Sequence, residues 1–371
     1  DLLDRAVRDF RLLLGMSERR AAWKELQQDE RQVAGLDLFI ERLQGLASAL
    51  ESAEGSDKAL DGALERSRQL HAIAERIASD DDSNNVRWYE TTRMGFRLSQ
   101  TPLEIAEAFQ KQMWHHAMAW VFTSATLAVG EDFSHFCNQL GLDEETRTEK
   151  WDSPFDYAQQ ALWYVPKGLV EPSHAEFVER VLKASLPVIE ASGGKAFLLF
   201  TSYRALNRAA EILEEQALDY PLLVQGRAPK NELLNSFREA GNAVLLATGS
   251  FWEGVDVQGD ALSVVIIDKL PFAAPGDPLM QARLDALKAR GVNPFMQYQV
   301  PQAVIALKQG AGRLIRGSDD TGVLMVCDLR LLTKPYGKTF INAMPPFART
   351  RELDEVRAFL EHKKDAQPAG N

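Results

Sequence analysis

Apolar residues in the first part of the chain recur at the spacing of amphipathic helices. One set runs over residues 36–50 and a second over 60–77, with members three and four positions apart. Residues at these spacings lie on one face of a helix, so each set predicts a helix with one buried face. The polar runs 54–57 and 80–85 follow the two sets and predict turns. We therefore expect an all-helical segment over residues 1–85, built as a helical hairpin or a small bundle.

The pattern becomes mixed in the next stretch. Residues 86–90 and 96–98 have the composition of short strands. Pro102 is expected to begin a helix, because proline is tolerated in the first turn. The apolar run 119–123 after that helix is expected to be a further strand.

From about residue 151, short apolar runs alternate with amphipathic helices. Runs of this kind are typical of strands that are buried on both faces. Because parallel strands are joined by helical crossovers, the alternation predicts an α/β fold with helices on both faces of a mostly parallel sheet. Pro187 is expected to end its helix early. Strands are expected over 161–165, 196–200, 222–224, 243–247, 262–267 and 322–327, and helices over 175–189, 204–216, 229–240, 277–290, 297–316 and from about 350.

Composition narrows the classes of function. The 371 residues include 42 Lys and Arg against 53 Asp and Glu, and the net charge of −11 argues against a generally basic nucleic-acid coat, though not against a local basic groove. There is no apolar run of 18 residues and no signal-peptide pattern, so we expect no membrane span and a cytoplasmic location. Two cysteines indicate a reducing compartment, and the histidine spacings predict no metal site. The chain starts with Asp rather than Met, from which we expect a fragment boundary.

Two arginines three residues apart carry the first candidate chemistry. Gln309, Arg313 and Arg316 form the pattern Q-x-x-G-R-x-x-R, and on a helix the three side chains would share one face. A guanidinium is a permanently charged fork that matches phosphate oxygens. Presented to a nucleotide held by another domain, such a pair can act as an arginine finger. The alternative is an exposed helix whose arginines only solvate it.

Small hydroxyl residues follow several of the predicted strands. The carboxyl ends of parallel strands are where such sheets bind ligands, and hydroxyl and backbone N–H groups there can donate to nucleic-acid phosphates. The alternative is turn chemistry or capping of the following helix. Gln225 stands at a similar polar step and is a weaker candidate. The hydroxyl candidates at these strand ends are Ser124, Thr126, Thr248 and Ser250. F-T-S-Y at 200–203 also ends a predicted strand and resembles motif IV of superfamily 2 helicases, in which Thr201 and Ser202 would contact DNA phosphates.

Three stretches resemble motifs of superfamily 2 helicases. In chain order, T-S-A-T-L at 123–127 resembles motif III, G-S-F-W-E-G-V-D at 249–256 resembles motif V, and residues 309–316 resemble motif VI. The form F-W-E-G-V-D, with K-L-P-F at 269–272, is similar to the XPD/DinG branch and, within it, to bacterial DinG-like helicases. The resemblance covers about residues 86–348.

This resemblance implies a domain organisation. Residues 1–85 would be the returning part of a helical arch, and 86–130 the last piece of the first RecA-like motor domain. Residues 131–348 would be the complete second RecA-like domain, and 349–371 a C-terminal helix and tail. The chain would then be the C-terminal part of an ATP-dependent 5′–3′ DNA helicase that acts on single-stranded or forked DNA in repair or replication.

The resemblance also implies roles for individual residues. The chain contains neither G-x-x-x-x-G-K-[ST] nor D-E-x-H, so ATP and Mg²⁺ would be held mainly by an absent N-terminal half. A 4Fe–4S cluster is possible in the full protein, but two cysteines in this chain cannot ligate it. The C-terminal helix is a candidate contact for a replication protein such as the chi subunit of the polymerase III clamp loader. The motif residues expected near the nucleotide are Gln309, Arg313, Arg316, Glu253, Gly254 and Asp256.

Alternatives to the helicase interpretation remain at this point. The chain could be a non-catalytic DNA- or partner-binding module, whereas an RNA helicase of the DEAD-box class is disfavoured by F-W-E-G-V-D. Phe251, Trp252, Lys269 and Phe272 could contact DNA bases, but aromatic residues beside strand ends more commonly belong to the core. The G-K-T at 337–339 lacks the glycine that a phosphate-binding loop has five positions earlier, and we interpret it as structural.

Overall fold

The computed structural model describes residues 1–79, 84–116, 118–251, 261–273 and 276–366. The chain divides into two compact units with separate hydrophobic cores. The first unit comprises Asp1–Gln112 and Pro275–Val292, and the second comprises Met113–Ala274 and Asn293–Asn371. Helix α5 (Ala106–His115) crosses the boundary between these ranges.

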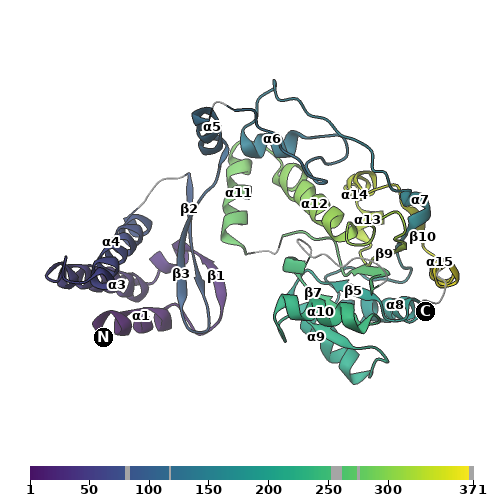
Figure 1. Cartoon of the computed structure of the whole chain (residues 1–371), viewed down its shortest axis with the longest axis horizontal. Helices are drawn as coiled ribbons and strands as arrows, with labels where there is room; N and C mark the ends of the chain where they lie inside the picture. The colour runs from purple at the N-terminus through teal and green to yellow at the C-terminus, as the bar shows by residue number, and fades with distance from the viewer. Residues whose placement is uncertain (80–83, 117, 252–260, 274–275, 367–371) are drawn as a thin grey trace. The chain divides into compact units, whose positions relative to one another are not determined.

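The first unit combines helices with a small antiparallel sheet (Figure 1). The expected helical hairpin is confirmed, because α3 (Glu30–Glu51) and α4 (Lys58–Ser79) pack against each other. Gly55 in the turn between them is left-handed, with φ 81°. In the described part of the unit, three strands pair in the order β1-β2-β3. The remaining elements are α1 (Leu2–Leu13), β1 (Arg19–Ala22), α2 (Trp23–Gln27), β2 (Asn85–Thr91), β3 (Phe96–Pro102) and α11 (Pro278–Ala289).

Strand β1 departs from the all-helical expectation for the first 85 residues. Its sequence, R-R-A-A, has no strand pattern of its own. The strand forms because it pairs with β2, where Ala21 lies opposite Tyr89 and both side chains are buried. Phe10 from α1 adds to the same core and contacts Phe96 edge-on at 4.9 Å between ring centroids. Tertiary pairing therefore overrides local preference at these four positions.

Helix α11 belongs to the first unit although it lies far along the chain. It confirms the helix expected over 277–290 and packs on β1 and β2. Arg20 forms an ion pair with Asp277 at 3.5 Å, and Arg290 pairs with Glu104. The sequence-based domain limits, which count this helix with the second domain, stay a prediction.

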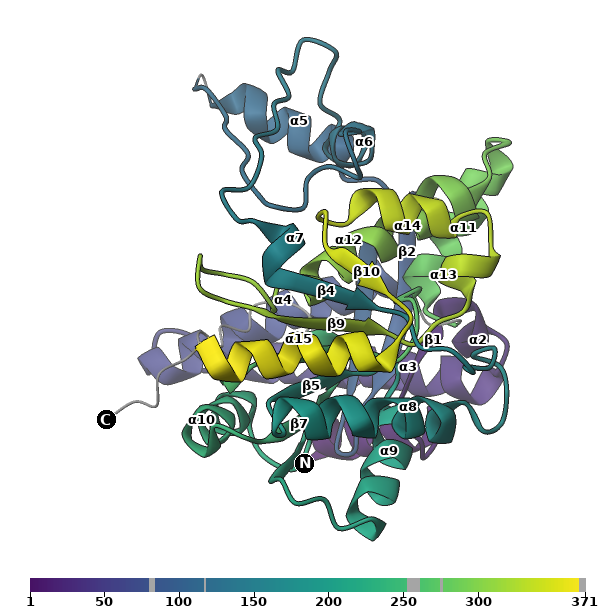
Figure 2. The same cartoon turned by 90° about the vertical axis from the view of Figure 1, so that its right-hand side faces the viewer.

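The second unit contains the parallel sheet that the sequence predicts (Figure 2). Over the described residues, seven strands pair in the order β10-β4-β9-β8-β5-β7-β6, and each adjacent pair is parallel. The predicted α/β fold class is thus confirmed. The strands are β4 (Ala161–Tyr164), β5 (Ala196–Leu199), β6 (Leu222–Val224), β7 (Val244–Ala247), β8 (Val264–Ile267), β9 (Gly322–Val326) and β10 (Ala348–Thr350).

Helices cover both faces of this sheet, as Figure 2 shows. Side chains alternate between two cores along each strand: Trp163 and Phe197 enter one, and Leu162 and Leu198 enter the other. The first core includes residues from α10 (Lys230–Ala240), α12 (Val300–Ala311), α13 (Arg330–Thr333) and α14 (Gly337–Ala343). The second includes residues from α8 (Phe177–Ser192), α9 (Tyr203–Glu215) and α15 (Leu353–Ala366). Short helices α6 (Ser134–Leu140) and α7 (Tyr157–Gln160) precede the sheet.

Two prolines behave differently from the expectation. Pro187 lies inside α8, which continues to Ser192 rather than ending early. Val188 is completely buried (0% exposed), and burial of this part of the helix outweighs the backbone hydrogen bond that proline cannot donate. Pro102 is the last residue of β3, and the following helix begins only at Ala106.

The apolar run 119–123 is not a strand, contrary to the expectation. Val121 is 82% exposed, and within the described ranges the run pairs with no strand. An isolated extended segment has no partner for its backbone N–H and C=O groups, so hydrophobicity alone does not make it a strand. Conversely, the three residues of β10 were not predicted, because a strand this short has no detectable pattern of its own.

Candidate functional site

Two of the candidate hydroxyl residues lie at neighbouring strand ends of the second unit. Thr201 follows β5 and Thr248 follows β7, and these strands pair in a register that places Leu199 opposite Ala247. The structure therefore brings Thr201 and Thr248 to the same carboxyl edge of the sheet. Ser202 lies beside them but caps α9, where its hydroxyl accepts a hydrogen bond from Ala205 N. This capping is the alternative considered for Ser202 from its sequence.

Gln225 connects three of these strand ends. Its Oε1 accepts hydrogen bonds from Thr248 N (2.6 Å) and Thr248 Oγ1 (3.2 Å). Its Nε2 donates to Tyr203 Oη at 2.8 Å. The polar step after β6 is therefore a structural part of the site, and it holds Thr248 in place from the neighbouring strand.

Asp268 is a site residue that the sequence analysis missed. It follows β8 directly and is 3% exposed. Its Oδ1 accepts hydrogen bonds from Thr201 N (3.1 Å) and Lys269 N (2.7 Å), and Oδ2 lies 3.5 Å from Thr201 Oγ1. Burial, aided by the nearby Asp328 carboxylate, raises the pKa of Asp268 to about 7 against the opposing effect of Lys269 and the backbone donors. The signal in the sequence was an aspartate directly after the apolar run V-V-I-I.

A second buried aspartate lies on the next strand. Asp328 follows β9 and is completely buried. Its carboxylate accepts hydrogen bonds from Leu270 N (2.8 Å) and Arg330 N (2.9 Å), and it forms an ion pair with the Arg330 guanidinium at 2.6 Å. Asp328 thereby ties the segment after β8 to the segment after β9. Together the two aspartates fix three strand ends of the sheet.

The two arginines of the third motif do not share a helix face, contrary to the expectation. Helix α12 ends at Ala311, so that Gln309 lies on the helix and Arg313 and Arg316 lie in the turn after it. The side chains of all three are half-buried. A turn, rather than a rigid helix, therefore presents these guanidiniums.

Two consecutive side chains in the segment after α12 are buried. Leu314 and Ile315 are both part of the first core of the sheet. Leu314 packs against Gly322 at the start of β9, where a Cβ atom would lie 2.5 Å from Leu314 Cδ1. In this non-helical segment the side chains of Leu314 and Ile315 both pack in the core of the sheet, and Arg313 and Arg316 are therefore not on a helix.

The loop after Arg316 is held by hydrogen bonds. The Asp320 carboxylate accepts from Arg316 N (2.9 Å) and Gly317 N (2.8 Å). Gln160 Nε2 donates to the carbonyl oxygens of Gly317 (2.8 Å), Ser318 (2.9 Å) and Asp320 (2.9 Å). The backbone that carries Arg316 is therefore ordered by contacts within its own unit.

The first motif lies on an irregular segment of the second unit. Ser124 is exposed and its Oγ lies 3.2 Å from Thr126 Oγ1. Shortly after, Lys308 of α12 donates from Nζ to Ala128 O at 3.2 Å. Burial lowers the pKa of Lys308. This contact ties the segment to α12, the helix that carries Gln309.

Several expected site residues lie outside the described residues. These are Glu253, Gly254 and Asp256, together with Trp252; for Ser250 only the backbone, in a 3-10 turn over Gly249–Phe251, is described. Their proposed roles stay predictions.

The aromatic candidates that are described belong to the core. Phe251 is 1% exposed, and Phe272 contacts the rings of Phe295, Tyr336 and Phe340. The structural interpretation of G-K-T is also supported, because a Cβ on Gly337 would lie 2.0 Å from the Leu331 carbonyl oxygen. That glycine allows α13 and α14 to approach closely.

Neither a metal-binding cluster nor a membrane-spanning helix occurs in the described ranges. There, no three His, Cys, Asp or Glu side chains gather closely enough to hold a metal ion. Every helix in the same ranges is too short or too polar to span a bilayer.

Comparison with known proteins identifies the family. Residues 186–347 match the helicase C-terminal domain family. The chain is 42% identical over 364 residues to the ATP-dependent DNA helicase YoaA of Haemophilus influenzae, which covers 98% of this chain and 57% of that protein. It is 33% identical over 300 residues to the ATP-dependent DNA helicase DinG of Photobacterium profundum, covering 78% of this chain and 43% of that protein. The chain belongs to the XPD/DinG-like family of superfamily 2 helicases, and it spans little more than half the length of its YoaA relative.

A solved structure of apo XPD shares the fold. It superposes with a TM-score of 0.58 and covers 95% of this chain and 68% of the XPD chain, at 13% sequence identity. The likeness concerns the fold alone. It agrees with an α/β unit of the RecA type preceded by a largely helical segment.

Proposed function

We propose that this chain is the C-terminal part of an ATP-dependent DNA helicase that moves 5′ to 3′ on single-stranded or forked DNA. The observation that carries the proposal is the convergence of Thr201 and Thr248 at one carboxyl edge of the parallel sheet. Hydroxyl groups at such an edge suit contacts to a phosphate backbone, which position a strand without reading its sequence. A helicase must hold DNA in this way, because it moves along any sequence. A role in DNA repair or replication, in the cytoplasm, follows from the same assignment.

The nucleotide chemistry would be shared with the rest of the full-length protein. The chain contains no phosphate-binding loop, and its described residues offer no metal-ligating group, so ATP and Mg²⁺ would be held mainly outside it. Arg313 and Arg316 would contribute guanidiniums, and Gln309 would contact the nucleotide from α12. Glu253, Gly254 and Asp256 would lie close to the same nucleotide. A 4Fe–4S cluster, if the full protein has one, takes its ligands from elsewhere.

The isolated chain is expected to bind single-stranded DNA without hydrolysing ATP. Its phosphate contacts lie within the second unit, whereas ATP hydrolysis needs groups that the chain does not contain. The test measures fluorescence anisotropy with a labelled oligodeoxynucleotide at several salt concentrations, and phosphate release with ATP and Mg²⁺. Binding should weaken as salt rises. An RNA strand of the same sequence is the control.

Three results would contradict this expectation. Phosphate release by the isolated chain would show that ATP is held by the chain itself. Binding of RNA with clear preference over DNA would favour an RNA helicase. Binding of neither strand would leave only the rival assignment, a module that binds a partner protein.

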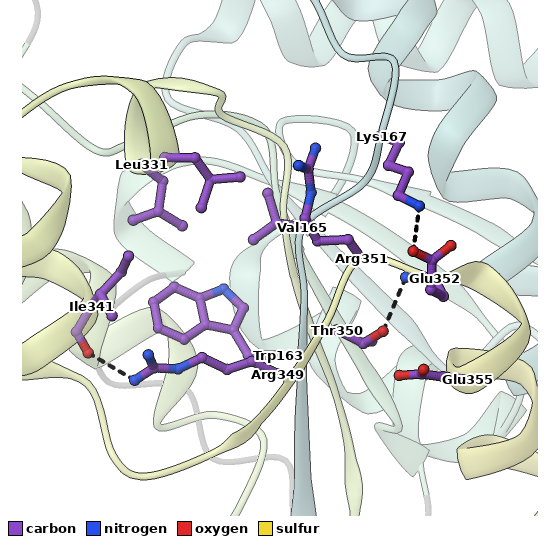
Figure 3. A pocket seen from close by; sticks show the side chains of 11 residues that line it. Trp163, Val165, Lys167, Leu331, Ile341, Arg349, Thr350, Arg351, Glu352 and Glu355 are labelled. Atoms are coloured by element: carbon purple, nitrogen blue, oxygen red, sulfur yellow. Dashed lines mark hydrogen bonds and ion pairs between the residues drawn. The ribbon is translucent and has the colours of Figure 1, made fainter.

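We propose as a second function that α15 and its surroundings dock a replication protein, with the chi subunit of the polymerase III clamp loader as the expected partner. A pocket of about 430 Å³ lies beside the first turn of α15 (Figure 3). Apolar residues of α13 and α14 line it, together with three cationic residues and two acidic ones. The charged residues are Arg349 in β10, Arg351, Glu352 and Glu355 after that strand, and Lys167 after β4. Trp163 Nε1 is buried and has no hydrogen-bond partner among the described residues, while the Arg349 guanidinium lies over the Trp163 ring at 5.4 Å.

Charge reversal at the pocket rim is expected to weaken chi binding about tenfold or more, since a close charge pair at an interface contributes on the order of 1.4 kcal/mol or more. The variant is Arg351→Glu, because Arg351 lines the pocket and is exposed. Arg238→Glu on α10, also exposed, is the matched control. The dissociation constant with purified chi is measured by calorimetry. Equal affinities of Arg351→Glu and the unchanged chain would contradict docking at this pocket.

A further inference from the structure

The contact between Asp268 and Thr201 links a buried carboxylate to a predicted DNA contact. Thr201 is half-buried and follows β5, so its hydroxyl can be reached from the edge of the sheet. Asp268 lies behind it and accepts the Thr201 N–H at 3.1 Å, with Oδ2 3.5 Å from Thr201 Oγ1. A carboxylate can only accept hydrogen bonds. The ionised Asp268 side chain therefore draws the Thr201 hydroxyl proton inward, away from the edge.

Protonation of Asp268 reverses this polarity. A protonated carboxyl group has one O–H donor, and it can donate from Oδ2 to Thr201 Oγ1 while Oδ1 still accepts the two backbone N–H groups. The Thr201 hydroxyl proton is then available to a phosphate oxygen. Protonation also removes a negative charge that would repel that phosphate. Both effects of protonation strengthen the binding of DNA.

We propose that Asp268 is a positioning residue for DNA binding: Thr201 donates its hydroxyl to a DNA phosphate when Asp268 carries a proton, so that binding of DNA takes up one proton at this position. The proposal rests on the proposed function, because it assumes that Thr201 contacts DNA. It assigns to Asp268 a role that neither the motif resemblance nor the family comparison names.

The groups around Asp268 make such a proton uptake feasible near neutral pH. Lys269 on its own segment and the backbone donors favour the ionised form, while burial and Asp328 after β9 oppose it, so the pKa of Asp268 is about 7. Asp328 is itself paired with Arg330. Cys327, which lies between β9 and Asp328, stays neutral because burial and the two aspartates raise its pKa. Asp268 is thus the group in this cluster poised to change its charge.

The sign of the pH dependence follows directly. Raising the pH through about 7 ionises Asp268 in the free protein, and the DNA-bound form must regain the proton. If DNA binds only the protonated form, affinity falls about eightfold from about pH 6.5 to about pH 8, in proportion to the protonated fraction. Below about pH 6 Asp268 is largely protonated, so its titration should no longer change the affinity for DNA.

Asp268→Asn is the deciding variant. The asparagine side chain has the shape of the carboxyl group, and its amide can donate to Thr201 Oγ1 while its oxygen accepts the two backbone N–H groups. The variant therefore resembles the protonated form at every pH. With the 371-residue chain and a single-stranded oligodeoxynucleotide at constant salt, Asp268→Asn is expected to bind about elevenfold more tightly than the unchanged chain at pH 8, and only about 1.3-fold more tightly at pH 6.5.

Calorimetry in buffers of different ionisation enthalpy counts the protons. At about pH 8 the unchanged chain should take up close to one more proton per bound DNA than Asp268→Asn does. Thr201→Val, which removes the hydroxyl, should bind more weakly at pH 6.5 and lose most of the pH dependence that the unchanged chain shows. A purely structural role for Asp268 would change affinity without changing the proton count.

The outcomes separate the two proposals. If the unchanged chain and Asp268→Asn show the same pH slope and the same proton count, the role of Asp268 is overturned, while DNA binding by the chain stands. If the unchanged chain binds DNA at neither pH, the proposed DNA-binding function fails, and the inference fails with it. Comparing Asp268→Asn with the unchanged chain also removes the contribution of histidines that titrate in the same range.

Discussion

Replacing Arg316 with alanine in the full-length helicase is expected to lower kcat for ATP hydrolysis by about 10³-fold or more, with ATP binding largely intact. An arginine finger stabilises charge that develops on the transferred phosphoryl group, so its loss acts on the transition state rather than on binding. The loop that carries Arg316 is ordered by Asp320, which accepts hydrogen bonds from Arg316 N and Gly317 N. Arg313→Ala is expected to have a similar effect. Steady-state hydrolysis and binding of a fluorescent ATP analogue measure the two quantities.

Controls separate the finger from a general loss of charge. Arg316→Lys keeps the charge but lacks the planar fork, and it should recover only part of the activity. Arg238→Ala on α10 removes an exposed arginine of the same unit and should leave kcat unchanged. Turnover at the unchanged rate in both Arg313→Ala and Arg316→Ala would remove the finger assignment. A parallel fall in ATP affinity would indicate ground-state binding instead.

Asp328→Ala is expected to destabilise the second unit by about 3 kcal/mol, because breaking a buried ion pair leaves its partner uncompensated. Asp328 is completely buried, and its carboxylate satisfies Leu270 N, Arg330 N and the Arg330 guanidinium. Hydrogen exchange of the amides of β8 and β9 measures the opening free energy of this unit separately from the first. Exchange there should become faster by about two orders of magnitude.

Two further variants test the cause of this loss. Asp319→Ala changes an exposed carboxylate of the same unit, and surface substitutions of this kind normally stay within about 0.5 kcal/mol. The double variant Asp328→Leu, Arg330→Met replaces both charged partners by apolar groups, and it should be more stable than Asp328→Ala alone. If Asp328→Ala exchanges at the unchanged rate, the two aspartates are not the ties between strand ends that we infer.

Sequence patterns predicted the elements that carry many apolar residues in a regular spacing. The strands β4, β5, β7 and β8 and the helices α3 and α4 lie where the periodicity placed them, because each buries a face of its own. The short strands β1 and β10 were not predicted, because they form only by pairing with β2 and β4. The run 119–123 was predicted to be a strand and is not one. It is apolar enough for a strand but has no neighbour to pair with among the described residues.

The candidate site was likewise predicted only in part. Position after a predicted strand and motif resemblance together pointed to Thr201, Thr248, Gln309 and the two arginines, and the family membership of the chain is confirmed. The pattern could not show that α12 ends before Arg313, because the segment after the helix contacts residues far along the chain, as where Leu314 packs against Gly322 of β9. It could not single out Asp268 either, since a lone aspartate after a strand is indistinguishable from a turn residue.

By itself, then, the order of residues determined the α/β class of the second unit, the helical hairpin of the first and the family to which the chain belongs, because these depend on local periodicity and on short contiguous motifs. Only the tertiary structure decided which strand ends lie together, where the arginine-bearing turn begins and which carboxylates are buried. Those features depend on contacts between residues far apart in the chain, and the free energy of burying a charged or apolar group is set by the neighbours that folding brings to it.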